Sequence, residues 1–434
     1  MIGESELSHQ AGLFSQSAAQ LIRKAVSSDL VRKVAETFAT RLVLIATGVV
    51  TSVMVARVLG PEGRGLYAVA MTTSLMGIQF GNLGLPTSNT YYGAKRRELL
   101  PALLGNSLFI SFCFGTLAVA GVGLVFALRP TIAPLQGTLL ILALAWIPIG
   151  LAYLLLQNLL LGIQAVRAYN RIELASKLVS VGLIAIIILV GLVTVETVFV
   201  ASLLALLISF FLALKCLVKR ITGGPTLSHD LFFQNMRYGF KAYLTALFAF
   251  LMLRADLLMI RYLLDAEQAG YYSVAANLAD LVYLLPATVG TIVFPKLAAL
   301  DSSRDKWRLS RQLTFGVGAL MVPITLLAAV SAKMVVSFLF GERFLPAVPA
   351  FLLLLPGILF YSAAFCLPFL SSIGLPRGVL WLWAAVVAFN LSINACIIPR
   401  FGILGAAGVS SVTYTLCFFV FTFYAWKLAR GQEA

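Results

Sequence analysis

The sequence predicts an all-α polytopic membrane protein with about 12 transmembrane helices, in two parallel-repeat six-helix lobes with cytoplasmic N- and C-termini. Three observations predict this class. Only 11% of the 434 residues are charged and 60% are apolar, whereas soluble domains carry about 25% charged residues. Apolar runs of about 20 residues recur, each long enough to cross a hydrocarbon core of roughly 30 Å as a helix. One polar motif also occurs twice, once in each half of the chain.

The apolar runs define the predicted membrane spans. Each run is bounded by polar or turn-forming residues, as expected where a helix leaves the bilayer. The longest hydrophilic connection, "KRITGGPTLSHDLFFQNMR", separates six runs from six. The predicted spans cover residues 37–59, 66–88, 103–128, 138–161, 172–193, 195–217, 240–262, 272–298, 312–332, 349–372, 378–398 and 403–427.

The distribution of lysine and arginine orients these spans. With the N-terminus in the cytoplasm, the cytoplasmic segments hold roughly three times as many basic residues as the outer segments, which is the usual bias of membrane proteins. The net charge of +15 is therefore mainly a topology signal, with a contribution from contacts to anionic lipid head groups. We expect no nucleic-acid partner.

The central hydrophilic connection suggests the domain boundaries. Residues 1–36 are polar and basic, and their apolar residues recur at helical spacing, which predicts a cytoplasmic amphipathic segment. We expect an N-terminal lobe of spans 1–6 at 37–218, a cytoplasmic linker at 219–238 and a C-terminal lobe of spans 7–12 at 239–428. Residues 429–434 would form a cytoplasmic tail.

The two halves share a motif at their first outer turn. "RVLGPEGRGLYAVA" at 57–70 corresponds to "RYLLDAEQAGYYSVA" at 261–275, so that Gly65 aligns with Gly270. Six predicted spans separate the two copies, and the repeats therefore have the same orientation. Parallel repeats are typical of transporters, in which the substrate site lies between the halves.

Polar residues form stripes on predicted spans 1, 2, 7 and 8. Polar groups that lack a partner in hydrocarbon are costly, so these stripes should face protein or water. A wet cavity bounded by the four spans explains them; for the serine, threonine and glycine positions, ordinary helix-packing seams are the alternative. The candidate substrate-binding residues are Arg41, Gln79, Asn82, Asn89, Arg254, Asn277 and Asp280.

The charged residues favour a cavity, because a charge at mid-membrane costs about 2.5–3.5 kcal/mol or more. Arg254 and Asp280 both lie roughly 12 Å from the outer ends of their spans, a depth that suits an ion pair as well as a cavity role. Arg41 lies about 6 Å from the cytoplasmic end and can snorkel. Asp256 points away from Arg254, and we expect a structural contact there. Asp256, Asp280 and Glu196 are also candidates for ion coupling.

Several motifs, in order along residues 35–428, resemble those of polysaccharide transporters. "ARVLGPEGRGLYAVA" with "LGLP" resembles their first two spans, and "RADLLMIRYLLDAEQAGYYSVAANLAD" resembles their seventh and eighth. "GERFLPAVPAFLLLLPGILF", "LSSIGLPRG" and "IIPRFGILGAAGVS" are similar to the region from the ninth span to the twelfth. The family is the O-antigen (Wzx-like) flippase branch of the multidrug/oligosaccharidyl-lipid/polysaccharide (MOP) superfamily.

This resemblance implies a function. It implies the bilobed fold of multidrug (MATE) exporters and lipid II flippases, alternating access, and an undecaprenyl-pyrophosphate-linked oligosaccharide as cargo in a bacterial cytoplasmic membrane. It also implies partners that polymerise the polysaccharide and set its length, and it makes Arg41 the nearest match to a substrate-binding arginine of lipid II flippases. A drug or cation exporter, a lipid II flippase and, less well supported, a membrane-embedded polymerase or ligase are the alternatives.

Cofactors and catalytic groups are not expected. No GxxxxGK[ST] phosphate-binding motif is present, which argues against ATP hydrolysis by this chain. The five cysteines lack metal-ligand or disulfide spacing, and no long outer loop exists to carry catalytic groups. We expect a transporter without catalytic residues or metal, driven by a proton or sodium gradient, by the membrane potential, or by consumption of the product outside.

Overall fold

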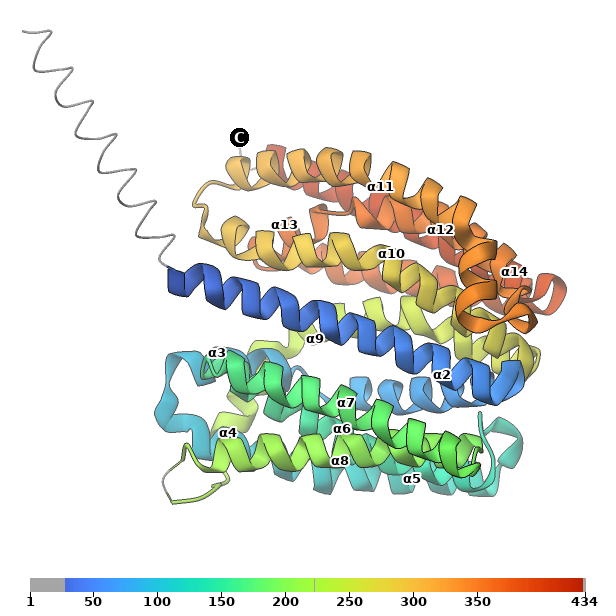
Figure 1. Cartoon of the computed structure of the whole chain (residues 1–434). Coiled ribbons are helices and arrows are strands. Elements are labelled where there is room, and N and C mark those ends of the chain that lie inside the picture. The colour runs from blue at the N-terminus through green and yellow to red at the C-terminus, as the bar shows by residue number, and fades with distance from the viewer. Residues whose placement is uncertain (1–27, 222, 432–434) are drawn as a thin grey trace, which may run out of the picture.

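The fold is helical throughout the part of the chain that the structure describes. The computed structural model describes residues 28–221 and 223–431, with side chains from Val43 to Arg430. Within these residues it contains α-helices, short 3-10 helices and a π-helical turn, and no strand. Figure 1 shows long helices running nearly side by side. The predicted all-α membrane class is confirmed, whereas most of the amphipathic segment expected at 1–36 lies outside the described residues.

The first half of the described chain forms one group of helices. Its core lies where α6 packs against α8 and the later part of α2, and it includes the fully buried side chains of Leu155 and Phe199. The helices are α2 (Ser28–Gly81), α3 (Leu85–Lys95), α4 (Leu100–Phe109), α5 (Gly115–Leu128), α6 (Gly137–Gly162), α7 (Val166–Val190) and α8 (Val195–Val218), with a π-helical turn at Ile110–Phe114.

The second half forms a second group, and α9 joins the two. α9 packs against α2 and α3, and also against α10 and α14. Figure 1 shows α10 to α14 together on one side of the first part of α2 and α4 to α8 on the other. The helices are α9 (His229–Leu263), α10 (Ala266–Ala299), α11 (Ser303–Phe340), α12 (Ala347–Ser362), α13 (Cys366–Ser372) and α14 (Arg377–Gly431).

Two helices are interrupted by a single glycine. Gly60 in α2 has φ 68° and ψ −176°, and Gly402 in α14 has φ 59° and ψ −146°, backbone conformations that side chains with a Cβ scarcely adopt. The described chain holds nine helices suited to crossing a membrane, and the bent pair α12 and α13 makes a tenth. The count of twelve follows if α2 and α14 are each two spans, and it stays a prediction.

The second predicted span differs from the structure at both ends. We expected it at 66–88, but its helix starts directly after Gly60, at Pro61, and ends at Gly81. Proline is favoured at the first helical position, where its missing N–H is not needed. At the other end, the Asn82 side chain accepts a hydrogen bond from the Gly84 backbone N–H at 3.0 Å, which stabilises the turn before α3. Arg64 therefore belongs to the helix, not to an outer turn.

The two copies of the motif touch each other through their glycines. A Cβ on Gly65 would lie 1.7 Å from the Ala266 carbonyl oxygen, and a Cβ on Gly270 would lie 1.9 Å from the Pro61 oxygen. The second helix of α2 and the start of α10 are thus in backbone contact, as small residues allow between membrane helices. The duplicated motif is the contact between the two halves at this end.

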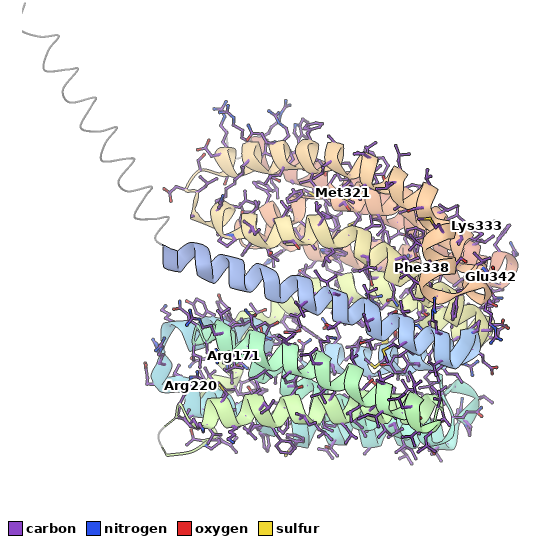
Figure 2. The ribbon with its side chains drawn as sticks, in the orientation of Figure 1. Arg171, Arg220, Met321, Lys333, Phe338 and Glu342 are labelled. Atoms are coloured by element: carbon purple, nitrogen blue, oxygen red, sulfur yellow. The ribbon has the colours of Figure 1, made fainter. Side chains whose placement is uncertain are left out.

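Side chains at the helix ends agree with the predicted segregation of charge. Arg171 and Arg220, expected on the cytoplasmic side, lie toward one end of the helices, and Lys333, expected outside, lies toward the other (Figure 2). The side of the membrane on which each end lies stays a prediction, as do the domain boundaries.

The glycine contact predicts a large effect of Gly65→Val. The added side chain would overlap the Ala266 carbonyl, and such overpacking costs about 1–3 kcal/mol or more. We expect a lowered thermal-unfolding midpoint of the purified protein. Gly182→Val is the matched control, because a Cβ on Gly182 meets nothing within 4 Å; equal stability of the two variants would contradict the contact.

Candidate functional site

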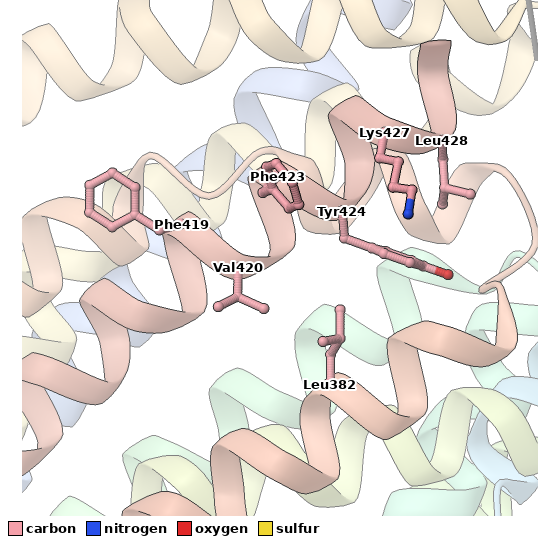
Figure 3. A pocket seen from close by; sticks show the side chains of 7 residues that line it. All are labelled: Leu382, Phe419, Val420, Phe423, Tyr424, Lys427 and Leu428. Atoms are coloured by element: carbon pink, nitrogen blue, oxygen red, sulfur yellow. The ribbon is translucent and has the colours of Figure 1, made fainter. Parts of the chain in front are cut away.

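None of the described charged residues predicted for the site lines the groove or the cavity that follow. A groove of about 690 Å³ runs between the two halves of α14 (Figure 3), and its lining is apolar apart from Tyr424 and Lys427. A cavity of about 550 Å³ between α10 and α12–α13 is lined by Tyr283, Thr291 and Tyr361. We therefore locate the candidate site from the polar contacts between helices.

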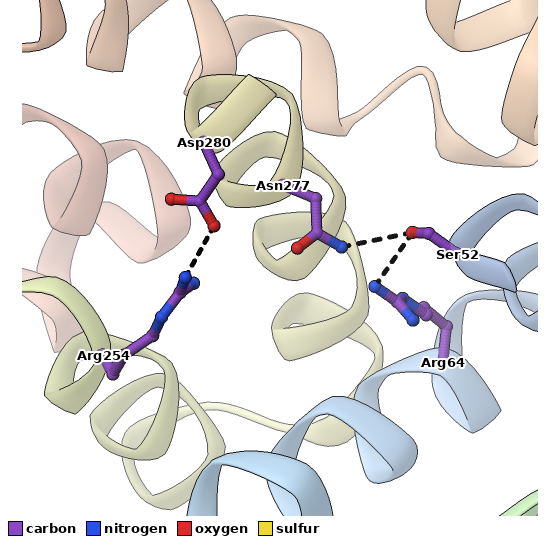
Figure 4. Close-up of polar contacts among 5 residues, drawn as sticks. All are labelled: Ser52, Arg64, Arg254, Asn277 and Asp280. Carbon is purple, nitrogen blue, oxygen red and sulfur yellow. Dashed lines mark hydrogen bonds and ion pairs between the residues drawn. The ribbon is translucent and has the colours of Figure 1, made fainter. Parts of the chain in front are cut away.

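Arg254 of α9 and Asp280 of α10 form an ion pair. The Arg254 Nη2 donates to the Asp280 Oδ2 at 2.6 Å (Figure 4). Their side chains are 32% and 44% exposed, so the pair is only partly covered by the protein. The equal depth of the two residues in neighbouring spans predicted that they could pair, and the structure brings them together.

A second set of polar contacts lies beside the pair. Asn277 stands one helical turn before Asp280 on α10, and its Nδ2 donates to the Ser52 Oγ at 3.3 Å. The Arg64 Nη2 also donates to the Ser52 Oγ at 3.3 Å. Figure 4 shows the five side chains converging from α2, α9 and α10. We call Ser52, Arg64, Arg254, Asn277 and Asp280 the inter-half cluster.

Arg64, like Ser52, is not among the substrate-binding residues that the sequence predicts. Its side chain is 6% exposed and its Nε has no hydrogen-bond partner. The guanidinium lies 5.9 Å from the centre of the Tyr67 ring, whose hydroxyl is within 3.0 Å of the Ser202 Oγ. No carboxylate among the described residues pairs with Arg64. We had assigned it to an outer turn; the signal that would have corrected this is Pro61, which starts the helix three residues earlier.

Asp256 lies in a packed interior. It is 2% exposed, and it accepts hydrogen bonds from the Tyr272 hydroxyl and, at 3.1 Å, from the Ser410 Oγ. These contacts tie α9 to α10 and to the second half of α14. They agree with the expected structural contact, and ion coupling by Asp256 stays a prediction.

The other candidate residues whose side chains the structure describes do not join the inter-half cluster. Asn82 stabilises the turn before α3 and donates to the Gln79 Oε1 at 3.2 Å. Asn89 is buried and donates to the Ser107 Oγ at 2.9 Å, inside the first group of helices. Glu196 lies in the first turn of α8. The side chain of Arg41 is outside the described part, so its role, like the binding roles of the others, stays a prediction.

An arginine also joins the two halves beside the glycine contact. The Arg57 Nε donates to the Leu339 carbonyl at 2.7 Å, and its Nη2 donates to the Phe338 carbonyl. These carbonyls belong to the last turn of α11, which leaves its final carbonyl groups without helical partners. The guanidinium thus satisfies orphan acceptors while it holds the end of one half against the other.

Comparison with known proteins decides the family. Residues 54–349, more than half of the chain, match the family model described as "Polysaccharide biosynthesis protein". The chain belongs to this family. The matched region includes both copies of the motif and the whole of the inter-half cluster apart from Ser52, which precedes it by two residues.

Curated relatives of this polysaccharide biosynthesis protein match over part of their length. A putative O-antigen transporter of Shigella flexneri is 22% identical over 36% of this chain and 38% of its own, and a probable flippase of Haloferax volcanii is 24% identical over 37% and 35%. An uncharacterised membrane protein of Methanocaldococcus jannaschii is 27% identical over 38% and 33%. The aligned part of the chain thus spans little more than a third of these relatives.

Solved structures show the fold. An inward-facing MATE-family multidrug transporter of the MOP superfamily superposes with a TM-score of 0.75 over 90% of this chain and 95% of its own, at 14% identity. The lipid II flippase MurJ superposes with a TM-score of 0.68 over 89% and 86%, also at 14% identity. The predicted resemblance to the MATE and MOP fold is confirmed, and the names of the relatives agree with membership of the flippase branch.

The ion pair predicts non-additive mutations. Arg254→Ala and Asp280→Ala should each lower the free energy of unfolding, and the double variant should lose less than the sum. We expect a coupling free energy of about 1 kcal/mol, because partial exposure weakens the pair. Chemical unfolding in detergent would measure it. Arg254→Ala combined with Glu196→Ala is the additive control, and additivity in the Arg254–Asp280 cycle as well would contradict the pair.

Proposed function

We propose that this protein moves an undecaprenyl-pyrophosphate-linked oligosaccharide from the cytoplasmic to the outer leaflet of a bacterial cytoplasmic membrane, for the synthesis of a surface polysaccharide. Family membership and the names of the relatives support transport of a lipid-linked saccharide. The fold supports a non-enzymatic transporter. The carrier lipid, the direction and the pathway are the proposed parts.

The observation that carries the proposal is the charge of the inter-half cluster. It holds two arginines and one carboxylate, which pairs with Arg254. Arg64 is buried, and among the described residues its side chain hydrogen-bonds only to a serine hydroxyl and lies near the neutral Tyr67 ring. A buried guanidinium without a counter-charge is costly, which favours an anion as its partner during the working cycle. The planar donor fork of arginine binds phosphate oxygens bidentately, and a pyrophosphate provides them.

The position of the cluster suits alternating access. Ser52 and Arg64 come from the first half of the chain, and Arg254, Asn277 and Asp280 from the second. A ligand bound to both sets would respond to any movement of one half against the other, as expected for a transporter built from repeats. The backbone contact of Gly65 with α10 and the hydrogen bonds of Arg57 hold the expected outer end closed, which leaves the cytoplasmic end for loading.

A further cavity near the expected cytoplasmic end has groups that suit a sugar. It measures about 880 Å³ and is lined by Thr90, Tyr91, Lys95, Asn158 and Tyr238, among others. The rings of Tyr91 and Tyr238 stack with centroids 4.4 Å apart, although they belong to α3 and α9. Hydroxyl and amide groups beside aromatic faces are able to bind sugar hydroxyls and sugar rings. We assign this cavity to the oligosaccharide before transport.

The driving force belongs to the same proposal. Asp280 is the carboxylate that contacts a cluster arginine directly, so protonation of Asp280, or its displacement from Arg254 by the cargo phosphate, would free the guanidinium. Asp256 and Glu196 remain candidates for ion coupling from other positions. A polymerase and a chain-length regulator are the proposed partners that would take up the product.

The test uses Arg64→Met in proteoliposomes that contain a fluorescent undecaprenyl-pyrophosphate-linked oligosaccharide. We expect transport to fall at least tenfold, equivalent to about 1.4 kcal/mol. Stability should be unchanged or higher, because methionine fills the site without a buried charge. Transport is measured as access of the labelled sugar to an impermeant quencher, and stability as the thermal-unfolding midpoint.

The controls distinguish an effect of the inter-half cluster on transport from an effect of losing one positive charge anywhere in the protein. Arg129→Met removes an exposed arginine outside the cluster and should transport normally. Normal transport by both Arg64→Met and Arg254→Ala would overturn the role of the cluster. Absence of lipid-linked transport in the unmodified protein, with ion-driven efflux of dyes instead, would favour a drug exporter.

A further inference from the structure

The apolar groove of α14 has the form of a site for a lipid chain. Leu382 of the first half of α14 and Phe419, Val420 and Phe423 of the second half line its walls (Figure 3). Its volume of about 690 Å³ lies in the range of roughly 300–1,000 Å³ typical of small-ligand sites. The lining contains no carboxylate and no polar side chain along these walls.

The groove opens towards the bilayer. Phe419 and Phe423 are 55% and 64% exposed, although they lie on a helix suited to crossing a membrane. Ser410, which contacts Asp256 in the interior, precedes the groove residue Phe419 by about 14 Å and Lys427 by about 25 Å along the helix, at 1.5 Å per residue. The groove is lined by residues of α14 alone. It therefore shares no residue with the inter-half cluster and is not an extension of it.

One end of the groove is cationic. The Lys427 ammonium group points into the groove (Figure 3), and no ion pair involves it among the described residues. Arg430 follows one turn later, with its guanidinium 4.4 Å from the centre of the Trp426 ring, and Arg377 begins α14 at the same end. Trp and basic residues together are typical of a helix end at head-group depth.

Gly378 shapes the floor of the groove at its cationic end. A Cβ on Gly378 would lie 2.3 Å from the Tyr424 hydroxyl oxygen, so the absence of a side chain lets the Tyr424 ring reach across to the first half of α14. The ring thereby closes the bottom of the groove next to Lys427. The result is an apolar channel that ends at one ammonium group and one phenol.

We propose that this groove binds one acyl chain of an anionic phospholipid from the surrounding membrane, with its phosphate on Lys427. The apolar walls match a hydrocarbon chain, and the cationic end matches an anionic head group. Basic pockets between transmembrane helices bind such head groups. The proposal does not depend on the proposed function, because the groove faces the bilayer and not the inter-half cluster.

Native mass spectrometry of the full chain in detergent tests the site. Phosphatidylglycerol and phosphatidylcholine with identical acyl chains are the probes. We expect Lys427→Gln to weaken the retention of one phosphatidylglycerol about fivefold, the effect of one lysine near an anionic head group, with phosphatidylcholine unaffected. Lys219→Gln, which changes an exposed lysine at the end of α8, should leave both lipids unaffected.

A second variant tests the apolar walls. Val420→Trp should fill the groove and remove one retained lipid of either kind, while its ring stays in an apolar environment. Unchanged retention of phosphatidylglycerol in Lys427→Gln, or unchanged lipid number in Val420→Trp, would overturn the site. Displacement of phosphatidylglycerol by an equimolar polyprenyl phosphate would overturn the phospholipid as occupant and assign the groove to the carrier lipid of the cargo.

Discussion

The backbone contact between Gly65 and Gly270 is the constraint on which the rest of the interface depends. The second helix of α2 and the start of α10 come from opposite halves, and each glycine packs directly against the backbone of the other helix. A Cβ at either position would overlap that backbone. Arg64 is the neighbour of Gly65, and Asn277 lies two turns after Gly270. Close approach therefore brings Asn277 to the Ser52 hydroxyl that Arg64 contacts within α2. Without it, Asn277 of the second half would lose its hydrogen bond to Ser52 of the first half.

The repeat keeps its backbone contact but has diverged in its charges. When Gly65 is aligned with Gly270, Arg64 corresponds to Ala269, and Asp280 corresponds to Leu75. Each half thus contributes polar groups that the other half lacks. The inter-half cluster is asymmetric for this reason, and α9 adds Arg254 to it. An asymmetric site suits a cargo whose two ends differ, such as a charged head group joined to a neutral sugar.

The sequence predicted the class of fold and the positions of most helices, because composition and the lengths of the apolar runs determine them. Equal depth on neighbouring spans permitted an ion pair between Arg254 and Asp280 but left a cavity role open. It did not predict Arg64, because a turn was assumed where Gly60 alone interrupts the chain. It also placed Asn82 and Asn89 on a polar stripe facing a cavity, whereas they make contacts within the first half. Helical periodicity predicts on which face of its helix a residue lies. It does not predict which other helix packs against that face.

The glycine break at Gly60 has a consequence for biosynthesis. The two helices of α2 are joined by one residue, so the ribosome delivers the second apolar segment immediately after the first. Only three charged side chains lie near the turn at Gly60, namely Arg57, Glu62 and Arg64. Few charged groups therefore have to cross the membrane when this turn is inserted. We expect the two segments to insert together as a helical hairpin. The glycine contact between the future halves then waits until α10 has been synthesised, some two hundred residues later.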